Sequence, residues 1–356
     1  MRAGTAVGIT NWEPSDDNQY LDRLTSALMT VGITPLPLRL EPRPVLRAFV
    51  QGMRTVHVHW PEYLVVPRTS SRSGSARNAV QLLRIALALV LCKLLRVKIV
   101  WTVHNLGPHE IDASWAAFRA YELVSRTADE FVLHSHAAAR RAQLRFPRAR
   151  GRVTVAPHGH YLGVHPPARA TRSEVRARYG IPSGAFLLLA FGQVRPYKRL
   201  VELSRMLLAA GPGEVHLLIA GAVLDNELSE ELERISEASE SVHLDLRRIP
   251  ADQVSALYGA SDAAVINYKE LFSSGSLLLA LSQGLPVISA HSEAVSEVAD
   301  WPAISTYADL AGLLQAVERL AGTDVEARRS VALAAANAAS WERAASTLRE
   351  VYATAD

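Results

Sequence analysis

Short apolar segments alternate with longer stretches of helical periodicity along the chain, and polar or glycine-containing turns separate them. In the first half the strand-like segments are residues 5–10, 35–38, 55–59, 98–104, 130–133 and 152–156. The pattern restarts at 185–191 and continues with 215–220, 242–246, 263–266 and 286–289. Strands and helices that alternate in this way form parallel sheets with helices on both faces. The sequence therefore predicts an α/β protein with two doubly wound parallel sheets.

The length also indicates two domains. A chain of 356 residues exceeds one ordinary hydrophobic core, and two domains of moderate size are the natural solution. Residues 159–171 are rich in Gly, Pro and His and read as a linker. We expect a first domain over residues 1–165 and a second over residues 166–356, with a last helix that begins after Ser340.

Two strand–turn–helix segments carry the strongest functional pattern. Residues 191–199 place Gly192, Arg195 and Lys198 directly after a strand, and residues 270–288 place a turn rich in Ser and Gly before an apolar helix. That turn consists of Ser273, Ser274, Gly275 and Ser276. Its free backbone N–H groups and the positive end of the helix dipole attract an anion, and Arg and Lys add charged donors. Together the two turns predict a pyrophosphate site, whereas the serine turn alone is also typical of an ordinary helix N-cap.

Polar side chains gather after the strands of the first half, at the sheet edge where parallel sheets bind ligands. The candidates are Asn18, Glu62, His104, Asn105, His109 and Glu110. An imidazole at His104 can bond a hydroxyl or transfer a proton, or it can satisfy backbone groups of its loop. For His57, inside a strand, a structural role is favoured. No set of His, Cys and carboxylates has metal-ligand spacing, and no G-x-G-x-x-G opens the first domain, so we expect neither a metal nor a cofactor.

Charge divides the chain. Residues 1–160 contain 21 Lys and Arg against 11 Asp and Glu, a net charge of +10, while the remainder has 17 against 24, a net charge of −7. No acidic residue lies between Glu62 and Glu110, where the basic residues are Arg68, Arg72, Arg77, Arg84, Lys93, Arg96 and Lys98. Such a patch suits an anionic membrane surface, or it is simply a solvated basic face. No recognition motif points to nucleic acid.

The apolar run 85–92 and the single cysteine bear on location. The run is either the buried part of an amphipathic helix or an interfacial helix, with Arg84, Lys93 and Arg96 at the level of lipid headgroups. A lone Cys92 fits a reducing compartment, and the first ten residues do not read as a secretory signal. We expect a cytoplasmic protein, with a peripheral place on the inner face of the plasma membrane as the finer expectation.

The two segments of the second half resemble the donor half of GT-B glycosyltransferases, above all the large retaining family of bacterial polysaccharide and lipid glycosyltransferases. That family carries G-R-x-x-x-x-K-G; Gly192 and Lys198 match it, whereas Gln193 and Arg199 replace its Arg and second Gly. The family's E-x7-E loop ends in E-A-x-A-x-G-x-P-V. Alignment on Ala280, Gly284, Pro286 and Val287 puts Leu271 and Leu279 at the two Glu positions, with Glu270 one residue early. This degenerate loop is similar to a side branch of exopolysaccharide mannosyltransferases.

The resemblance implies two Rossmann-like domains that face a cleft, with the last helix crossing back to the first domain. It implies transfer of a hexose of mannose or glucose type from a GDP- or UDP-linked sugar, GDP-mannose among them, to a sugar acceptor that is lipid-linked or a polysaccharide precursor. The first domain would bind the acceptor through Asn18, Glu62, Asn105 and His109. The second domain would bind the donor through the two turns described above.

Catalysis would fall to His104, Glu110 and Glu270, and an inverting reaction would take its base from Asp16, Glu62, Glu110 or His104. Without the D-x-D of GT-A enzymes, we expect metal independence. The alternatives are a nucleotide-sugar epimerase and a non-catalytic, donor-binding partner of another transferase.

Overall fold

The computed structural model describes residues 5–12, 19–65, 75–108, 114–211, 213–268, 272, 275–298 and 301–353. The chain forms two compact units, the first comprising Met1–Gly159 and Ser340–Asp356, and the second His160–Ala339. The chain thus returns to the first unit for its last helix. The acceptor and donor roles expected for the two units remain predictions.

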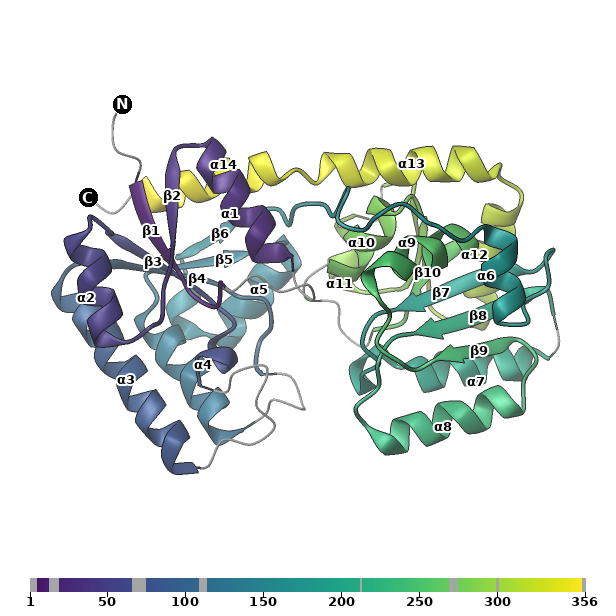
Figure 1. The fold of residues 1–356 in the computed structure, drawn as a ribbon, viewed down its shortest axis with the longest axis horizontal. Coiled ribbons are helices and arrows are strands. Elements are labelled where there is room, and N and C mark those ends of the chain that lie inside the picture. Colours follow the sequence, from purple (N-terminus) through teal and green to yellow (C-terminus); the bar gives the residue numbers. More distant parts are fainter. Residues whose placement is uncertain are drawn as a thin grey trace. The chain divides into compact units, whose positions relative to one another are not determined.

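The first unit is built on a parallel sheet with strand order β2-β1-β3-β4-β5-β6. The strands are β1 (Thr5–Ile9), β2 (Ile33–Pro37), β3 (Thr55–His59), β4 (Lys98–Thr102), β5 (Glu130–Leu133) and β6 (Val153–Val155). The helices are α1 (Tyr20–Thr30), α2 (Pro42–Val50), α3 (Ser75–Leu94), α4 (Trp115–Thr127), α5 (His136–Arg145) and α14 (Trp341–Ala353), with 3-10 turns η1 (Pro61–Leu64) and η3 (Pro147–Ala149). Figure 1 shows α1 and α14 on one face of the sheet and α2, α3 and α4 on the other. Right-handed crossovers require this division, because β1 reaches β2 in the opposite direction to all later steps.

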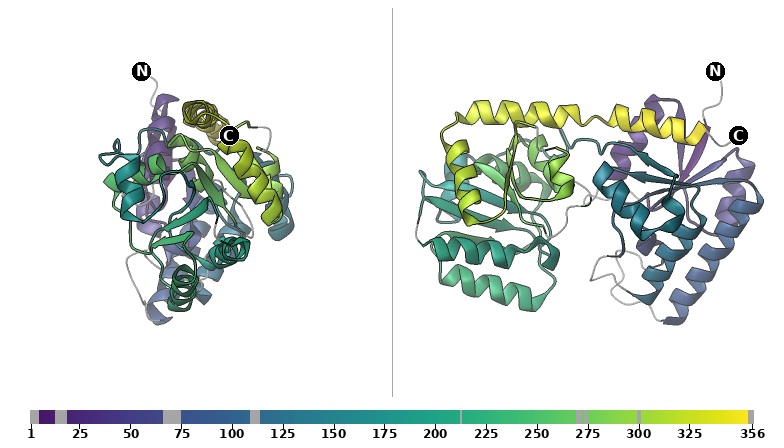
Figure 2. Two further views of the ribbon diagram at one scale, coloured as in Figure 1. Left: turned by 90° about the vertical axis from the view of Figure 1, so that its right-hand side faces the viewer. Right: turned by 180° about the vertical axis from the view of Figure 1, so that it is seen from behind.

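The second unit repeats the architecture with strand order β12-β11-β10-β7-β8-β9. Its strands are β7 (Phe186–Phe191), β8 (Val215–Ala220), β9 (Val242–Asp245), β10 (Ala263–Ile266), β11 (Val287–Ala290) and β12 (Ile304–Tyr307). Its helices are α6 (Arg172–Arg178), α7 (Leu200–Ala210), α8 (Asn226–Glu237), α9 (Ala251–Ala260), α10 (Gly275–Ser282), α11 (Glu293–Ser296), α12 (Leu310–Ala321) and α13 (Val325–Ala338), with the 3-10 turn η4 (Pro196–Lys198). Figure 2 shows α7 and α8 side by side along one face of this sheet. The two parallel sheets confirm the predicted doubly wound α/β class.

The core of the second unit has two layers, one on each face of the sheet. Leu187 and Leu189 of β7 pack with α6, α9, α10 and α13, whereas Leu188 and Ala190 pack with α7, α8 and α12. A strand covered on both faces needs apolar side chains at successive positions. The continuous run Leu187–Leu188–Leu189 therefore reads as a strand even without alternation.

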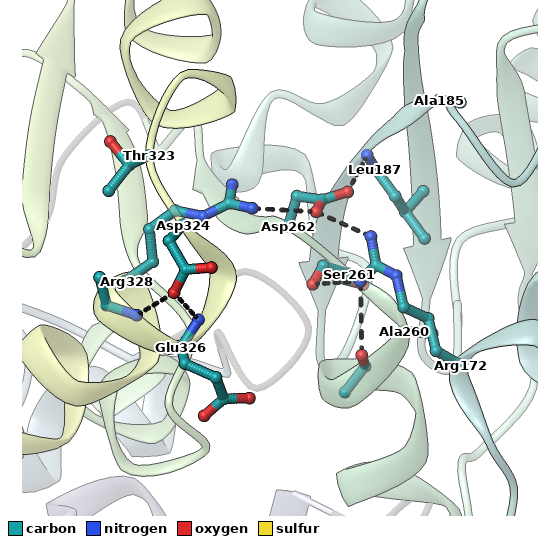
Figure 3. Close-up of polar contacts among 12 residues, drawn as sticks. Arg172, Ala185, Leu187, Ala260, Ser261, Asp262, Thr323, Asp324, Glu326 and Arg328 are labelled. Carbon is teal, nitrogen blue, oxygen red and sulfur yellow. Dashed lines mark hydrogen bonds and ion pairs between the residues drawn. The ribbon is translucent and has the colours of Figure 1, made fainter.

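A buried carboxylate anchors the edge of this core. Asp262, next to the start of β10, accepts from Arg172 and Arg176 at 2.7 Å each and from the Leu187 backbone at 2.9 Å. Arg328 of α13 reaches it at 3.5 Å, and Figure 3 shows Arg172 and Arg328 approaching from opposite sides. Removal of one partner from a buried ion pair of this kind destabilises the fold strongly, because the other charge stays buried without compensation. The cluster thus ties α6 and α13 to the sheet.

Two sequence expectations need adjustment. The strand β12, Ile304–Tyr307, was absent from the predicted set; it is an edge strand whose Ser305 and Thr306 interrupt the apolar pattern. The run 85–92 is not one face of a helix: Ile85, Leu89 and Cys92 are fully buried, and other members of the run face outward. Among the described helices, none combines the length and apolarity that crossing a membrane requires.

Candidate functional site

The turn after β7 lies at the point where the strand order of the second sheet reverses. β7 has β8 on one side and β10 on the other, so the segments that leave β7 and β10 diverge at the carboxyl edge. Crevices at such switch points are where open parallel sheets bind ligands. Gly192 has φ +91°, and a Cβ on Gly221 would lie 2.4 Å from the Gly192 carbonyl oxygen. Two glycines therefore bring the ends of β7 and β8 into close contact.

Lys198, in η4, is the central charge of this turn. Its side chain is only 5% exposed, and its Nζ donates to the Phe191 carbonyl at 3.1 Å. The ammonium lies 5.4 Å from the ring centroid of Tyr268, and no described carboxylate pairs with it. Burial lowers the pKa of Lys198 to about 8; Tyr197 raises it and Arg195 lowers it to lesser extents. A buried cation with so little compensation favours an anionic ligand.

Arg195 supplies a second cation beside it. Its Nη2 donates to Oε1 of Gln193 at 2.9 Å, while its Nη1 is buried without a hydrogen-bond partner among the described residues. Gln193 occupies the position where the retaining GT-B family, which this segment resembles, has Arg. The structure thus uses that position to orient Arg195, and leaves one guanidinium nitrogen for another acceptor.

The segment after β10 contributes residues that the sequence reasoning missed. Tyr268 donates to Oγ of Ser276 in the first turn of α10 at 2.9 Å, and its ring lies 5.4 Å from that of Tyr197. Asn267 donates to the Arg199 carbonyl at 2.8 Å. Contacts through Tyr268 therefore link Lys198 to Ser276, and the pyrophosphate site stays a prediction. The position of Asn267 and Tyr268 directly after a strand was the available signal.

The E-x7-E position is filled differently. Leu279, at the place of the second Glu, is partly buried and packs against the hydrophobic core beside α10. It cannot hydrogen-bond a ribose. Several predicted residues lie outside the described part of the chain: Asp16, Asn18, Arg68, Arg72, His109, Glu110, Glu270, Ser273 and Ser274.

In the first unit, four consecutive strands bring histidines to the carboxyl edge of the sheet. These are His57 and His59 of β3, His104 after β4, His134 after β5 and His158 after β6. Tyr20, at the start of α1, makes edge-on ring contacts with four of them, at centroid distances between 4.9 and 5.8 Å. The pattern of histidines after strands was visible in the sequence, but their convergence on Tyr20 depends on strand order.

His104 is held by two aromatic neighbours. Its ring stacks on Trp60 at 4.1 Å with an interplanar angle of 11°, and its Nε2 lies 3.0 Å from Nδ1 of His59. Burial, with coulombic contributions from neighbouring histidines, holds the pKa of His59 well below 6.5. His59 is therefore neutral at pH 7, and its Nε2 has no partner among the described residues. The contact with His59 therefore orients one ring nitrogen of His104.

His57 has a structural environment. Its Nδ1 lies 2.6 Å from the Tyr352 hydroxyl of α14, and its Nε2 lies 2.7 Å from Oγ1 of Thr102. Both ring nitrogens are satisfied inside the first unit, and burial lowers the pKa of His57 to about 3. Of the predicted acceptor residues, Glu62 is fully buried in η1 and Asn105 is half-buried after β4. Across the described residues, no group of three or more His, Cys, Asp and Glu forms a candidate metal site.

Known proteins were compared with this chain in sequence and in structure. No protein-family model matches the chain. A GDP-mannose:glycolipid 4-beta-D-mannosyltransferase of Xanthomonas campestris pv. campestris is 26% identical over 299 residues, which cover 83% of this chain and 76% of the relative.

Solved structures share the fold. Anabaena HepE, crystallised with UDP and glucose, matches with a TM-score of 0.62 at 16% identity, over 98% of this chain and 99% of that one. The catalytic domain of starch synthase IV from Arabidopsis thaliana, bound to ADP and acarbose, matches with a TM-score of 0.66 at 12% identity, over 99% of both chains. The solved structures confirm the predicted fold, that of the GT-B glycosyltransferases, and the relative in sequence is a hexosyltransferase.

Proposed function

We propose that the protein transfers a mannose-type hexose from a GDP-linked donor to a lipid-linked sugar. The observation that carries the donor half is the buried Lys198, which lacks a described carboxylate and lies at the switch point of the second sheet. The choice of GDP-mannose and of a lipid-linked acceptor rests on the similarity to the Xanthomonas mannosyltransferase, whose name specifies both.

The donor pyrophosphate would occupy the turn after β7. Lys198 and the free nitrogen of Arg195 would neutralise its charge, and the first turn of α10 would add backbone N–H donors. When the bond between the anomeric carbon and the phosphate oxygen breaks, negative charge develops on the nucleoside diphosphate. These cations stabilise that charge, so no bound metal is required for departure of the leaving group.

The acceptor hydroxyl would be activated at the histidine-lined edge of the first unit. His104 would accept the hydroxyl proton as the acceptor oxygen attacks the anomeric carbon, and His59 would keep the ring oriented. Stacking on Trp60 further restricts the ring. Glu62 and Asn105 are the described residues proposed to contact the acceptor sugar.

The positive charge of the first unit supports a place at the membrane surface. Its charge of +10 over residues 1–160 suits an anionic membrane surface, where a lipid-linked acceptor is found. The protein would then act as a peripheral enzyme on the inner face of the plasma membrane.

A thermal-shift panel followed by a transfer assay tests the function. GDP should stabilise the protein more than UDP, ADP or dTDP, because a ligand selective for the folded state raises its stability by mass action. GDP-mannose with a short-chain lipid-linked acceptor should then yield a mannosylated product, and GDP should be released only when acceptor is present. Release of GDP without acceptor, or stabilisation by GDP with no product on any acceptor, would refute the transferase assignment.

A further inference from the structure

Helix α3 exposes an unusual number of large apolar side chains. Val80, Leu83, Leu87, Val90 and Leu94 are each between 50% and 76% exposed. Their spacing of three, four, three and four residues places them on one side of the helix, which we call the outer face of α3. At 1.5 Å per residue this face is about 21 Å long.

The opposite side of α3 already serves the core. Leu82, Ile85, Leu89 and Cys92 are buried against the first unit, so the outer face is not needed for folding. Between Val80 and Leu94 the charged residues of α3 are Arg84 and Lys93, and both flank the outer face. Helices that are apolar all round are normally covered on all sides, and a contiguous exposed apolar patch marks an interaction surface.

The helices beside α3 also expose large apolar side chains. Helix α3 packs against both α2 and α4, and Figure 1 shows the three helices on the same face of the sheet. Leu46 and Val50 of α2 and Trp115 and Phe118 of α4 are also exposed. Exposed aromatic side chains are typical of protein surfaces that enter the headgroup region of a bilayer.

The charges around this surface are mostly positive. Exposed basic residues on or beside α2, α3 and α4 are Arg43, Arg47, Arg77, Arg84, Arg96, Arg119 and Arg126. Among the described residues on or beside the three helices, the acids are Glu41, Glu122 and Asp129; Glu122 pairs with Arg119 and Arg126, and Asp129 with Lys93. An apolar stripe within a basic surround is complementary to an anionic bilayer.

We propose that the outer face of α3 inserts shallowly into an anionic bilayer and holds the enzyme on the membrane. The inference deepens the proposed function, since a lipid-linked acceptor must be reached at such a surface. A second copy of the chain fits less well, although the spacing also suits a coiled-coil seam. The positions that flank that seam include Arg84 and Lys93 and no acid, so two copies would juxtapose like charges.

The test compares two variants in vesicle co-sedimentation. The outer-face variant is Leu83→Gln, Leu87→Gln and Val90→Gln. The control variant is Leu144→Gln and Leu224→Gln, which changes leucines elsewhere that are at least as exposed. Glutamine is a good helix former, so both variants should fold, and thermal unfolding verifies this. Vesicles of phosphatidylglycerol are compared with vesicles of phosphatidylcholine, and sedimentation velocity reports the oligomeric state.

We expect wild type and the control variant to bind phosphatidylglycerol vesicles, and half-molar salt to weaken that binding by about tenfold or more. The outer-face variant should partition roughly 30-fold less, since it removes most of the inserted hydrocarbon. It should keep wild-type activity on a water-soluble acceptor. Equal binding by both variants, no binding by wild type, or a wild-type dimer that the outer-face substitutions dissociate would overturn the proposal. Because co-sedimentation needs no donor or acceptor, a failed transfer assay would leave this result unaffected.

Discussion

Replacement of Lys198 by Met should stabilise the protein and weaken its binding of nucleotide at the same time. Burial lowers the pKa of Lys198 from 10.5 to about 8, and each pKa unit corresponds to about 1.4 kcal/mol. Keeping the ammonium charged in the folded state at pH 7 therefore costs about 3 kcal/mol. Methionine has no such cost but loses the charge-assisted hydrogen bond to the Phe191 carbonyl, a loss of about 1.5 kcal/mol. The free energy of unfolding should rise by about 1.5 kcal/mol.

The sign of the pH dependence follows from the same shift. Between pH 8 and pH 10.5 the unfolded state holds the Lys198 proton more tightly than the folded state. The stability contributed by this residue in wild type therefore rises with pH across that window, and the advantage of the Met variant disappears there. The Lys198→Met substitution should weaken nucleotide binding although it stabilises the fold. Loss of a charge-assisted contact to pyrophosphate costs ~1.5–4 kcal/mol, or roughly 10–1000-fold in affinity.

Urea unfolding at pH 7 and pH 10, with and without millimolar GDP, measures both effects. The matched control is Lys98→Met, because Lys98 is also partly buried with a lowered pKa and donates to a backbone carbonyl, that of Val351. It lies in the other unit, and its loss should leave GDP binding intact. If Lys198→Met destabilises the apo protein and GDP still stabilises it as in wild type, Lys198 is a structural cation and the donor-site reasoning is wrong.

Three further expectations concern the donor turn, metals and acid. Gly275→Val should reduce GDP affinity more than Ser276→Ala in calorimetric titration, since bulk blocks close approach of phosphate while one hydroxyl is a minor donor; the reverse ranking would make the turn only a helix cap. Transfer activity should persist in EDTA, and complete loss restored by Mn²⁺ or Mg²⁺ would contradict a purely cationic site. Burial lowers the pKa of His57 and His158 to about 3 and that of His134 to about 4, so the unfolded state binds more protons below pH 6.5. The first unit should then lose stability by about 4 kcal/mol per pH unit as the pH falls from 6.5 towards 4, seen as falling urea midpoints, and a flat profile would show that these rings are charged when folded.

The strands were largely predictable, and the exception has a physical reason. Parallel strands covered on both faces are continuous apolar runs, as in β7 and in Leu217–Ala220 of β8, and such runs can be seen in the sequence. The edge strand β12 is covered less completely, so Ser305 and Thr306 are tolerated in it and the signal is lost. Helix α3 shows a second limit, because a helix that is apolar on every side gives no periodicity that separates the core face from the outer face.

The donor site was partly predictable. Gly192, Arg195 and Lys198 lie within one short turn, so their spacing alone brings them together. The hydrogen bond of Tyr268 to Ser276 also spans few residues, but Tyr268 carries no motif. The sequence also could not show that Gln193 accepts a hydrogen bond from the Arg195 guanidinium, because that contact depends on the local path of the backbone.

The sequence by itself determined the class of fold and the chemistry of the donor turn, since both depend on short-range pattern: apolar runs, glycines where φ is positive, and cations a few residues apart. Only the tertiary structure decided which distant side chains meet. His59 and His104 are 45 residues apart and become hydrogen-bonding neighbours because β3 lies beside β4, and His57 meets Tyr352 because the last helix packs on the first sheet. Strand order and the choice of a helix's buried face result from the packing of the whole unit, and no local segment contains that information.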